Sequence, residues 1–205
     1  MLPEVFYNHL CDEIRQNRDL YPYYKLVDGS SAQQQFRKAY FLQRLNYINN
    51  NVDTTSNPVI WDCGCGYGTT GLFFAMNNQP VLGTTLEYYA KEWEKRCSFW
   101  NNLGNTSLFS YKYANLFDEN FPDETFDYII LQDTLHHIEP LDEALKLFHK
   151  VLKKHGKIIL IEENGDSFIK RLILYKQRGN TRRSPLPDDE AVAARYIGTN
   201  YEKER

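Results

Sequence analysis

The chain has 205 residues, of which 42% are hydrophobic, so it is long enough for one domain with a sizeable core and some additional structure. Its formal net charge of −3 provides no global electrostatic attraction to nucleic acid or to an anionic membrane. No apolar run approaches the ~18 residues of a membrane-spanning helix, and acidic residues occupy the N-terminus where a signal peptide would be apolar; we therefore expect a cytoplasmic protein with no membrane partner.

Residues 1–56 are predicted to be mainly helical, because apolar side chains recur there at helical spacing. These side chains are Phe36, Tyr40 or Phe41, Leu45 and Ile48. The sequence NNNVDTTSNP at 49–58 is rich in Asn, Thr and Ser and is typical of a flexible linker. We expect this linker to join the helical region to the rest of the chain.

From Pro58 onward, short β runs alternate with helical patterns. The predicted strands cover residues 59–63, 81–87, 106–115, 126–133 and 156–163. The predicted helices cover residues 70–78, 88–104 and 140–156, the last with Leu141, Leu145, Phe148 and Leu152 on one face. This alternation predicts an α/β fold with parallel β-α-β units in an open, doubly wound sheet.

The sequence IWDCGCGYGTTG at 60–71 supports two interpretations. From Gly66 it has the G-x-G-x-x-G spacing of a turn that binds the pyrophosphate of NAD or FAD. From Asp62 it is an acidic residue that ends a strand, followed by three alternating glycines. A carboxylate there would repel a pyrophosphate but suits S-adenosylmethionine, which carries a sulfonium and an ammonium. Cys63 and Cys65 fit as small side chains beside the turn, since no second pair of ligands has the spacing of a zinc site.

The segment 113–163 favours the second interpretation. An acidic residue leads through a proline-bearing turn to Phe126 and Asp127, which open an apolar strand. A histidine-containing loop, a helix ending in V-L-K and a glycine before a hydrophobic strand follow in order. This segment resembles the second half of a class I S-adenosylmethionine-dependent methyltransferase of the small-molecule, type-11-like group. With the glycine turn and the second strand, the resemblance covers roughly residues 58–163.

The resemblance implies a Rossmann-like, mostly parallel sheet and transfer of a methyl group from S-adenosylmethionine to a small organic acceptor. The alternatives are an NAD-dependent oxidoreductase and a methyltransferase-like module that binds without catalysis. The methionine end of the cofactor would be wrapped by Asp62, Gly64, Cys65, Gly66 and Gly68. Glycines are needed in such a turn because a Cβ would block close backbone approach.

The resemblance also assigns residues to the nucleoside of the cofactor. Glu87 ends the second strand and would accept from both ribose hydroxyls, unless it is an exposed helix-capping acid. Tyr88 would flank the adenine or pack in the core. Asn115 stands where the family usually has an aspartate that accepts from the adenine amino group, and an amide oxygen can accept the same bond. Leu116 would donate its backbone N–H to the ring.

The end of the fourth strand is expected to line the sulfonium side of the site, beginning with Leu131 and Gln132. Asp133, His136 and His137 are the available bases. Because the donor methyl is already activated, holding donor and acceptor in line can supply much of the rate, and a general base is optional. We expect the two histidines to point in different directions, one of them satisfying backbone groups of its loop. No third ligand has a spacing that would make them a metal site.

Changes in sequence pattern divide the chain into an N-terminal helical region (1–56), a core (57–165) and a tail with a basic helix and a loop (166–205); the resemblance implies that the first is a cap and the second binds the cofactor. In related enzymes such caps cover the active site and select the acceptor. The aromatic residues of the cap either line an acceptor pocket or only pack its helices. They are Phe6, Tyr7, Tyr21, Tyr23, Tyr24, Phe36, Tyr40 and Phe41.

The tail contains a predicted amphipathic helix at 167–179 and a basic segment at 170–183 that has no acidic residue. That segment is either a local nucleic-acid patch or a solvated helix face, and the negative net charge agrees with the second. The family's sheet ends in a hairpin of two further strands, but nothing after Glu163 has a β pattern. We therefore expect a chain truncated before the sixth strand, whose edge strand at 157–162 is covered by the tail helix or pairs with a second copy as a homodimer.

Overall fold

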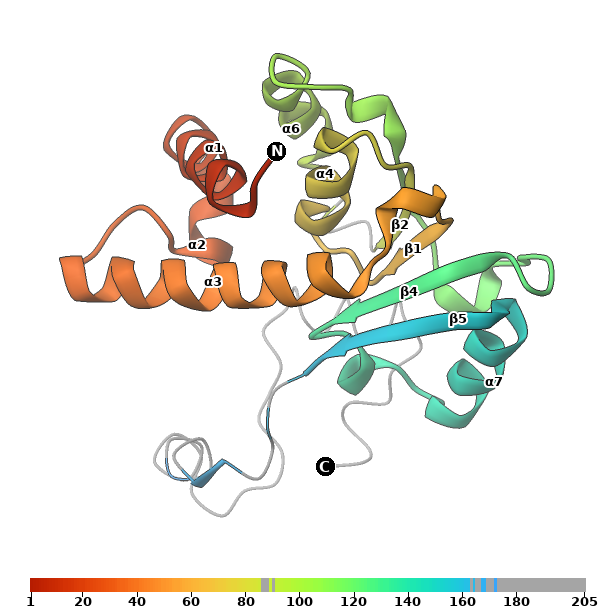
Figure 1. Cartoon of the computed structure of the whole chain (residues 1–205). Helices are drawn as coiled ribbons and strands as arrows, with labels where there is room; N and C mark the ends of the chain where they lie inside the picture. Colours follow the sequence, from red (N-terminus) through yellow and green to blue (C-terminus); the bar gives the residue numbers. More distant parts are fainter. Residues whose placement is uncertain (86–88, 90, 163, 165–166, 169–171, 173–205) are drawn as a thin grey trace.

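The computed structural model describes residues 1–85, 89, 91–162, 164, 167, 168 and 172 (Figure 1). Its strands are β1 (Ile60–Cys63), β2 (Val81–Thr85), β3 (Phe109–Tyr113), β4 (Phe126–Gln132) and β5 (Leu152–Ile161). All neighbouring strands are parallel, in the order β3-β2-β1-β4-β5. Each strand corresponds to one predicted from the sequence, and the predicted α/β class with a parallel sheet is confirmed.

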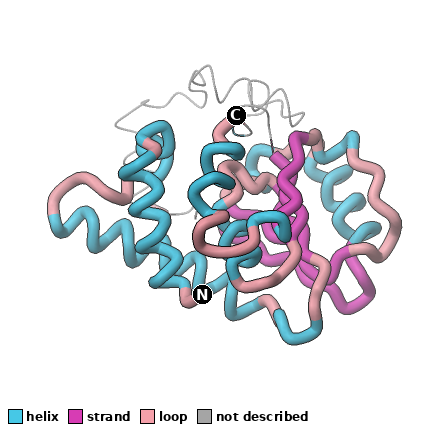
Figure 2. Tube along the Cα trace, turned by 90° about the horizontal axis from the view of Figure 1, so that it is seen from above, coloured by secondary structure: helices cyan, strands magenta, loops and turns pink. Residues whose placement is uncertain are grey.

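Helices cover both faces of this sheet, with α4 and α6 on one face and α7 on the other (Figures 1 and 2). The helices are α1 (Pro3–Gln16), α2 (Tyr21–Tyr24), α3 (Ser31–Asn51), α4 (Thr69–Met76), α6 (Trp93–Trp100) and α7 (Leu141–Val151). Short 3-10 turns connect them: η1 (Arg18–Leu20), η2 (Thr54–Ser56), η3 (Thr106–Leu108), η4 (Leu116–Asp118) and η5 (Leu135–His137). None of the helices in the described residues is long and apolar enough to cross a membrane.

The strands send alternate side chains to two hydrophobic clusters, one on each face of the sheet. The first cluster joins β1, β2 and β4 to α1, α3, α4 and α6, and includes Phe6, Leu10, Ile14, Leu45, Ile48, Ile60, Phe73, Phe74, Val81, Trp100 and Ile130. The second joins β1 and β4 to α7, and includes Trp61, Cys63, Phe126, Ile129, Leu131, Ala144, Phe148 and Val151. The N-terminal helices therefore share a core with the sheet.

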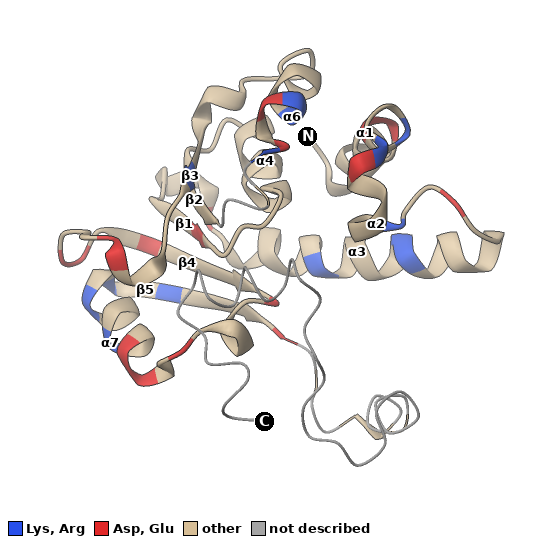
Figure 3. Cartoon of the chain, turned by 180° about the vertical axis from the view of Figure 1, so that it is seen from behind, with Lys and Arg blue, Asp and Glu red and all other residues tan. Residues whose placement is uncertain are grey.

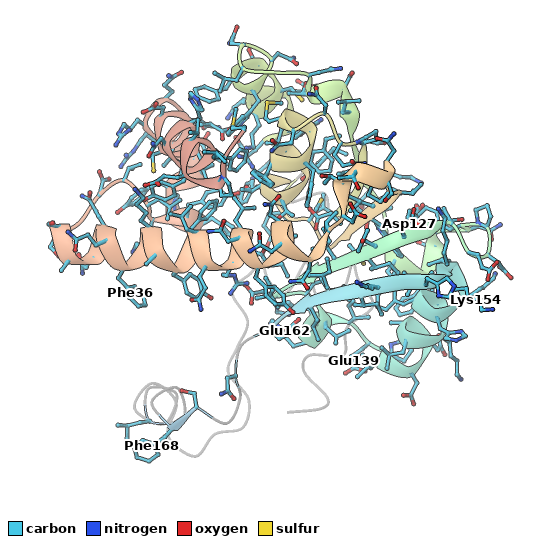
Figure 4. The ribbon with its side chains drawn as sticks, in the orientation of Figure 1. Phe36, Asp127, Glu139, Lys154, Glu162 and Phe168 are labelled. Atoms are coloured by element: carbon cyan, nitrogen blue, oxygen red, sulfur yellow. The ribbon has the colours of Figure 1, made fainter. Side chains whose placement is uncertain are left out.

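Helix α3 begins at a capping box. The hydroxyl oxygen of Ser30 accepts from the Gln33 N–H (3.4 Å), and the Gln33 side chain accepts from the Ser30 N–H (3.0 Å). The helix continues through Asn51, so the first part of the predicted linker is helical. Its predicted apolar face is buried only toward the C-terminal end, because Phe36 is 71% exposed and points away from α1 (Figure 4).

Helix α7 buries only Phe148 of the predicted face, and the helix ends at Val151, so Leu152 already belongs to β5. Ala144, Phe148 and Val151 are buried, whereas Leu141 and Leu145 are exposed. The buried positions follow the i, i+4, i+7 spacing of a helix face. The small Ala144 side chain is thus buried where the sequence pattern predicted burial of Leu141 and Leu145.

Strand β5 lies at one edge of the described sheet, as expected for an edge strand. Its Ile158 and Leu160 side chains are exposed on one face of the strand. The predicted tail helix, the absence of a hairpin and the cover of this edge fall almost entirely on residues outside the described part. They remain predictions.

Candidate functional site

Polar groups gather at the carboxyl edge of the sheet, where β1 ends between β2 and β4. The chain leaves β1 toward β2 and β3 on one side and reaches β4 and β5 on the other. In open α/β sheets, ligands bind at this kind of switch point, outside the carboxyl ends of the strands. The glycine turn after β1 and the loop after β4 meet there.

The glycine turn is tight and anchored to β2. The backbone N–H groups of Gly64 and Cys65 both donate to the Thr84 carbonyl oxygen (3.1 and 3.0 Å), and Gly68 donates to the Cys65 carbonyl (2.8 Å). Gly64, Gly66 and Gly68 have φ angles of +74°, +54° and +77°. This left-handed backbone favours glycine at all three positions.

The three glycines differ in what surrounds them. A Cβ on Gly64 would overlap the Thr134 side chain, and one on Gly68 would lie 2.5 Å from the Phe109 ring. Among the residues that the structure describes, a Cβ on Gly66 would meet only the hydroxyl of Tyr23, at an ordinary contact distance of 3.7 Å. Gly64 and Gly68 therefore allow the protein to pack, whereas none of the described residues is packed tightly against Gly66.

Asp62 is the last buried acid before the turn, with 2% of its surface exposed. Its Oδ2 atom is buried and has no hydrogen-bond partner among the described residues. Burial raises the pKa of Asp62 to about 7, and a backbone hydrogen bond from Gly71 acts in the opposite direction. A buried carboxylate oxygen without a partner is costly, so this position suits a cationic or hydrogen-bonding ligand.

Asp133 follows β4 in a left-handed conformation, with φ +50°. Its N–H donates to the Ile161 carbonyl (2.8 Å), and its side chain forms an ion pair with Arg44 of α3. Burial raises the pKa of Asp133, while Arg44 opposes the shift. Basic side chains are the only charged ones on α3, and its end nearest the sheet faces the acidic ends of β4 and β5 (Figure 3).

Glu162, at the end of β5 (Figure 4), organises the histidine loop. One carboxylate oxygen accepts from the Thr134 and Leu135 N–H groups (3.0 and 2.7 Å), and the other lies 2.5 Å from His136 Nδ1. The rings of His136 and His137 have centroids 3.9 Å apart, so the expectation that they point in different directions is wrong. The N–H groups of Thr134 and Leu135 in this loop are satisfied by Glu162, which was not predicted as a site residue.

The predicted adenine-side residues lie on the loop after β3. Asn115 Oδ1 accepts from the Phe117 N–H (3.0 Å) and caps η4. The second lone pair of this amide oxygen can accept a hydrogen bond from a ligand. Ala114 donates to the Thr85 carbonyl (3.0 Å), so this loop lies beside the end of β2. The Leu116 side chain is buried and offers only its backbone to a ligand.

Three further predicted residues differ in what the structure shows of them. Leu131 is fully buried in the second cluster, so only its backbone faces the site edge. Gln132 Oε1 accepts from the Thr70 hydroxyl at 3.5 Å, which links β4 to α4. Glu87 and Tyr88 lie outside the described residues.

Comparison with known proteins identifies this domain. The sequence profile of the family described as "Methyltransferase domain" matches residues 61–160, from β1 into β5. Residues 61–160 are a methyltransferase domain. With that assignment, the dinucleotide interpretation of the glycine turn is set aside.

Relatives of the methyltransferase domain agree with the fold. The chain is 24% identical over 139 residues to the uncharacterized methyltransferase YcgJ of Bacillus subtilis, covering 65% of this chain and 54% of YcgJ. The YcgJ crystal structure matches with a TM-score of 0.55 at 20% identity, over 73% of this chain and 65% of that one. PH0226 of Pyrococcus horikoshii matches with a TM-score of 0.55 at 20% identity, over 85% and 74%. These likenesses confirm the Rossmann-like fold.

A third relative has a more specific name. Phosphoethanolamine N-methyltransferase 3 of Arabidopsis thaliana is 26% identical over 112 residues, which cover 54% of this chain and 22% of that protein. The chain spans about half the length of the first curated relatives it matches, at 55% and 54%.

Residues of the N-terminal helices reach the methyltransferase domain beside the glycine turn. Tyr23 of α2 packs edge-on against Tyr67 and Tyr89, with ring centroids 5.0 and 6.2 Å away. The Tyr111 hydroxyl donates to the Gly66 carbonyl at 2.6 Å. Tyrosines from α2, the turn and β3 thus lie close to the glycine turn.

The cysteines of the turn have no feature of a metal site. Burial raises the pKa of the Cys63 and Cys65 thiols, which disfavours the thiolates that bind zinc. Within the part of the chain that the structure describes, no group of three or more potential ligand residues is placed to hold a metal ion.

Proposed function

We propose that this chain is an S-adenosylmethionine-dependent methyltransferase acting on a small organic acceptor. The observation that supports it best is that Asp62 and Gly66 occur together, at and just after the end of β1, in a methyltransferase domain. Within the described part of the chain, a buried Asp62 carboxylate oxygen has no hydrogen-bond partner, and the middle glycine of the turn that follows it has only the Tyr23 hydroxyl nearby. The cofactor would supply a methyl group already activated on a sulfonium.

The residues present fit that cofactor. Asp62 would order the turn near its positive charge, and the absence of a Cβ at Gly66 allows close backbone approach. Asn115 would use its second lone pair for the adenine amino group, with the Leu116 N–H beside it. We further propose Glu87 as the ribose acceptor and Tyr88 as its aromatic neighbour, from their place directly after β2.

The acceptor is proposed to enter between the helical cap (1–56) and the loop after β4. Tyr23 approaches Gly66, and Arg44 pairs with Asp133, so α2 and α3 both reach the edge where methyl transfer would occur. These contacts support a cap that selects the acceptor. The role of residues 1–56 as a cap is part of the proposal; their helices share a hydrophobic core with the sheet.

Where the acceptor must lose a proton, His136 is the proposed base. With its ring proton on Nδ1, His136 donates to Glu162, and Nε2 is then the nitrogen with a lone pair. A carboxylate behind the imidazole holds this tautomer and stabilises the protonated ring, as in other base–orienter pairs. His137 and Asp133 are the alternative bases, and turnover after substitution of each of the three residues would distinguish them.

Calorimetric titration with S-adenosylhomocysteine tests the cofactor, with NAD as the control ligand. We expect heat with the first and none with the second; the reverse result would overturn the proposal. Homocysteine release should then be screened with hydroxyl, amine and carbon acceptors, because named relatives include a phosphoethanolamine N-methyltransferase and a ubiquinone/menaquinone C-methyltransferase. Binding without release for every class would favour the non-catalytic module.

A further inference from the structure

A buried arginine connects the N-terminal helices to the glycine turn. Arg96 of α6 is fully buried, and Glu13 of α1 is almost so. Arg96 Nε and Nη2 donate to the two carboxylate oxygens of Glu13 at 2.8 and 2.7 Å. The Trp100 indole N–H donates to the same carboxylate at 2.8 Å. This bidentate pair fixes α1 against α6 with a defined geometry.

The third nitrogen of Arg96 reaches the cofactor side. Arg96 Nη1 donates to the Tyr67 carbonyl oxygen at 2.5 Å and to the Thr69 hydroxyl at 3.0 Å. It also lies 3.3 Å from the hydroxyl of Tyr24 on α2, which itself hydrogen-bonds Thr69. Tyr67 immediately precedes Gly68, and Thr69 is the first residue of α4.

One planar cation therefore holds three pieces of the chain in fixed relation: α1, α2 and the end of the glycine turn. A guanidinium presents its donors in a rigid fork, so the carboxylate on one side sets the direction of the donor on the other. If α1 or α2 moves away, Arg96 loses its buried counter-charge or a hydrogen-bond partner. Either loss is costly away from water, so the position of the helices and the shape of the turn depend on each other.

We propose that Arg96 is a positioning residue that couples docking of the N-terminal helices to the conformation of the cofactor-binding turn. This inference rests on the proposed function, because it names the residue through which helices outside the methyltransferase domain contribute to cofactor affinity. Coupling of this kind is reciprocal: the docked helices favour the cofactor, and the cofactor favours docked helices.

The test uses substitutions that leave the turn itself intact. Glu13→Gln removes the counter-charge but retains an oxygen for Trp100, and Tyr24→Phe removes one hydroxyl from the network. We expect Glu13→Gln to weaken S-adenosylhomocysteine binding by about 5- to 150-fold, the usual range of coupling between sites, and Tyr24→Phe to weaken it less. Lys38→Met is the matched control, because it breaks an exposed ion pair between α3 and Glu4 of α1, of length 2.6 Å.

A double variant, Glu13→Gln with Arg96→Met, separates positioning from stability. It leaves no buried charge unpaired, so its unfolding midpoint should recover relative to Glu13→Gln. Because Arg96→Met removes the donor to the Tyr67 carbonyl, affinity should be low in the double variant although its stability recovers. Recovery of both properties would reduce Arg96 to a structural role and overturn the inference, as would unchanged affinity in Tyr24→Phe and the double variant.

Hydrogen exchange of residues 1–24 gives an independent readout. We expect S-adenosylhomocysteine to slow exchange there in the wild type and in Lys38→Met, but not in the double variant. Equal slowing in all three would contradict the coupling. If the wild type binds no S-adenosylhomocysteine at all, the proposed function fails; if it binds and the variants bind equally well, only the coupling fails.

Discussion

Two arginine–carboxylate pairs join the N-terminal helices to the rest of the molecule, and they differ in their access to water. In the Arg96–Glu13 pair, the side chains are 0% and 2% exposed. In the Arg44–Asp133 pair, they are 12% and 41% exposed. The first pair therefore links the glycine turn to the N-terminal helices within the buried core. The second lies at the proposed acceptor side, where solvent or a ligand can replace either partner at modest cost.

Removing the buried cation gives the largest expected effect. Arg96→Met leaves the Glu13 carboxylate buried without a counter-charge, which should lower the free energy of unfolding by about 3–5 kcal/mol. Urea unfolding followed by circular dichroism measures this. A loss no greater than that of Arg44→Met would show that burial does not distinguish the two pairs.

Glu162 tests the acceptor side without touching either arginine. Glu162→Ala removes the acceptor of the Thr134 and Leu135 N–H groups, and should cost about 1–3 kcal/mol of stability. It also removes the partner of His136. Turnover should fall while S-adenosylhomocysteine affinity is retained. Lost affinity with normal turnover would place Glu162 on the cofactor side instead.

The pH dependence of cofactor binding should come from Asp62. Its pKa of about 7 in the folded chain lies above the ordinary value, so the carboxyl is neutral below that pH. A ligand with positive charge favours the ionised form, and binding must then release a proton. Affinity should fall as the pH drops from 8 to 6, by at most about tenfold per unit.

Calorimetry in buffers of different ionisation enthalpy detects that proton, and Asp62→Asn should abolish the dependence. The stability of the unliganded protein should change with pH in the opposite direction to the affinity. Because the folded pKa is raised, the unliganded chain should lose stability as the pH rises from ~4, the unfolded value, toward 7. A pH-independent affinity in the wild type would contradict the role of Asp62.

Arg44→Met should give the smallest effect on folding. Its pair with Asp133 is partly exposed, so we expect a loss of only about 0–1 kcal/mol. S-adenosylhomocysteine affinity should be unchanged, while the KM for the acceptor rises. A change in cofactor affinity would mean that both pairs act on the turn and that the contrast between them is wrong.

The strands could be predicted because each is an apolar run bounded by polar or glycine-rich turns. The buried faces of α3 and α7 were predicted less well, since Phe36 and Leu145 are as apolar as side chains that are buried. Local pattern does not tell which of them another element covers. The alternating glycines identified the turn. They did not show that Gly64 and Gly68 serve packing, whereas no described residue packs tightly against Gly66.

Contacts between distant parts of the chain could not be predicted. Arg96 and Glu13 are 83 residues apart, and both resemble ordinary charged positions on helix surfaces. Glu162 had a detectable signal, because an acid that ends a strand at the carboxyl edge of a sheet is placed for a ligand or a loop. The same signal identified Asp62 and Asp133.

The stacking of Phe6 on Trp100 has a consequence for the order of folding. Their ring centroids lie 4.6 Å apart, and Phe6 also meets Phe73 at 5.4 Å. Helix α1 leaves the ribosome before these partners, which are synthesised up to about ninety residues later. Until α6 has been synthesised, the apolar side chains of α1 stay exposed to solvent or bound to a chaperone. Such late closure of long-range contacts slows folding, so the step that completes the core should also be the one that places Glu13 against Arg96.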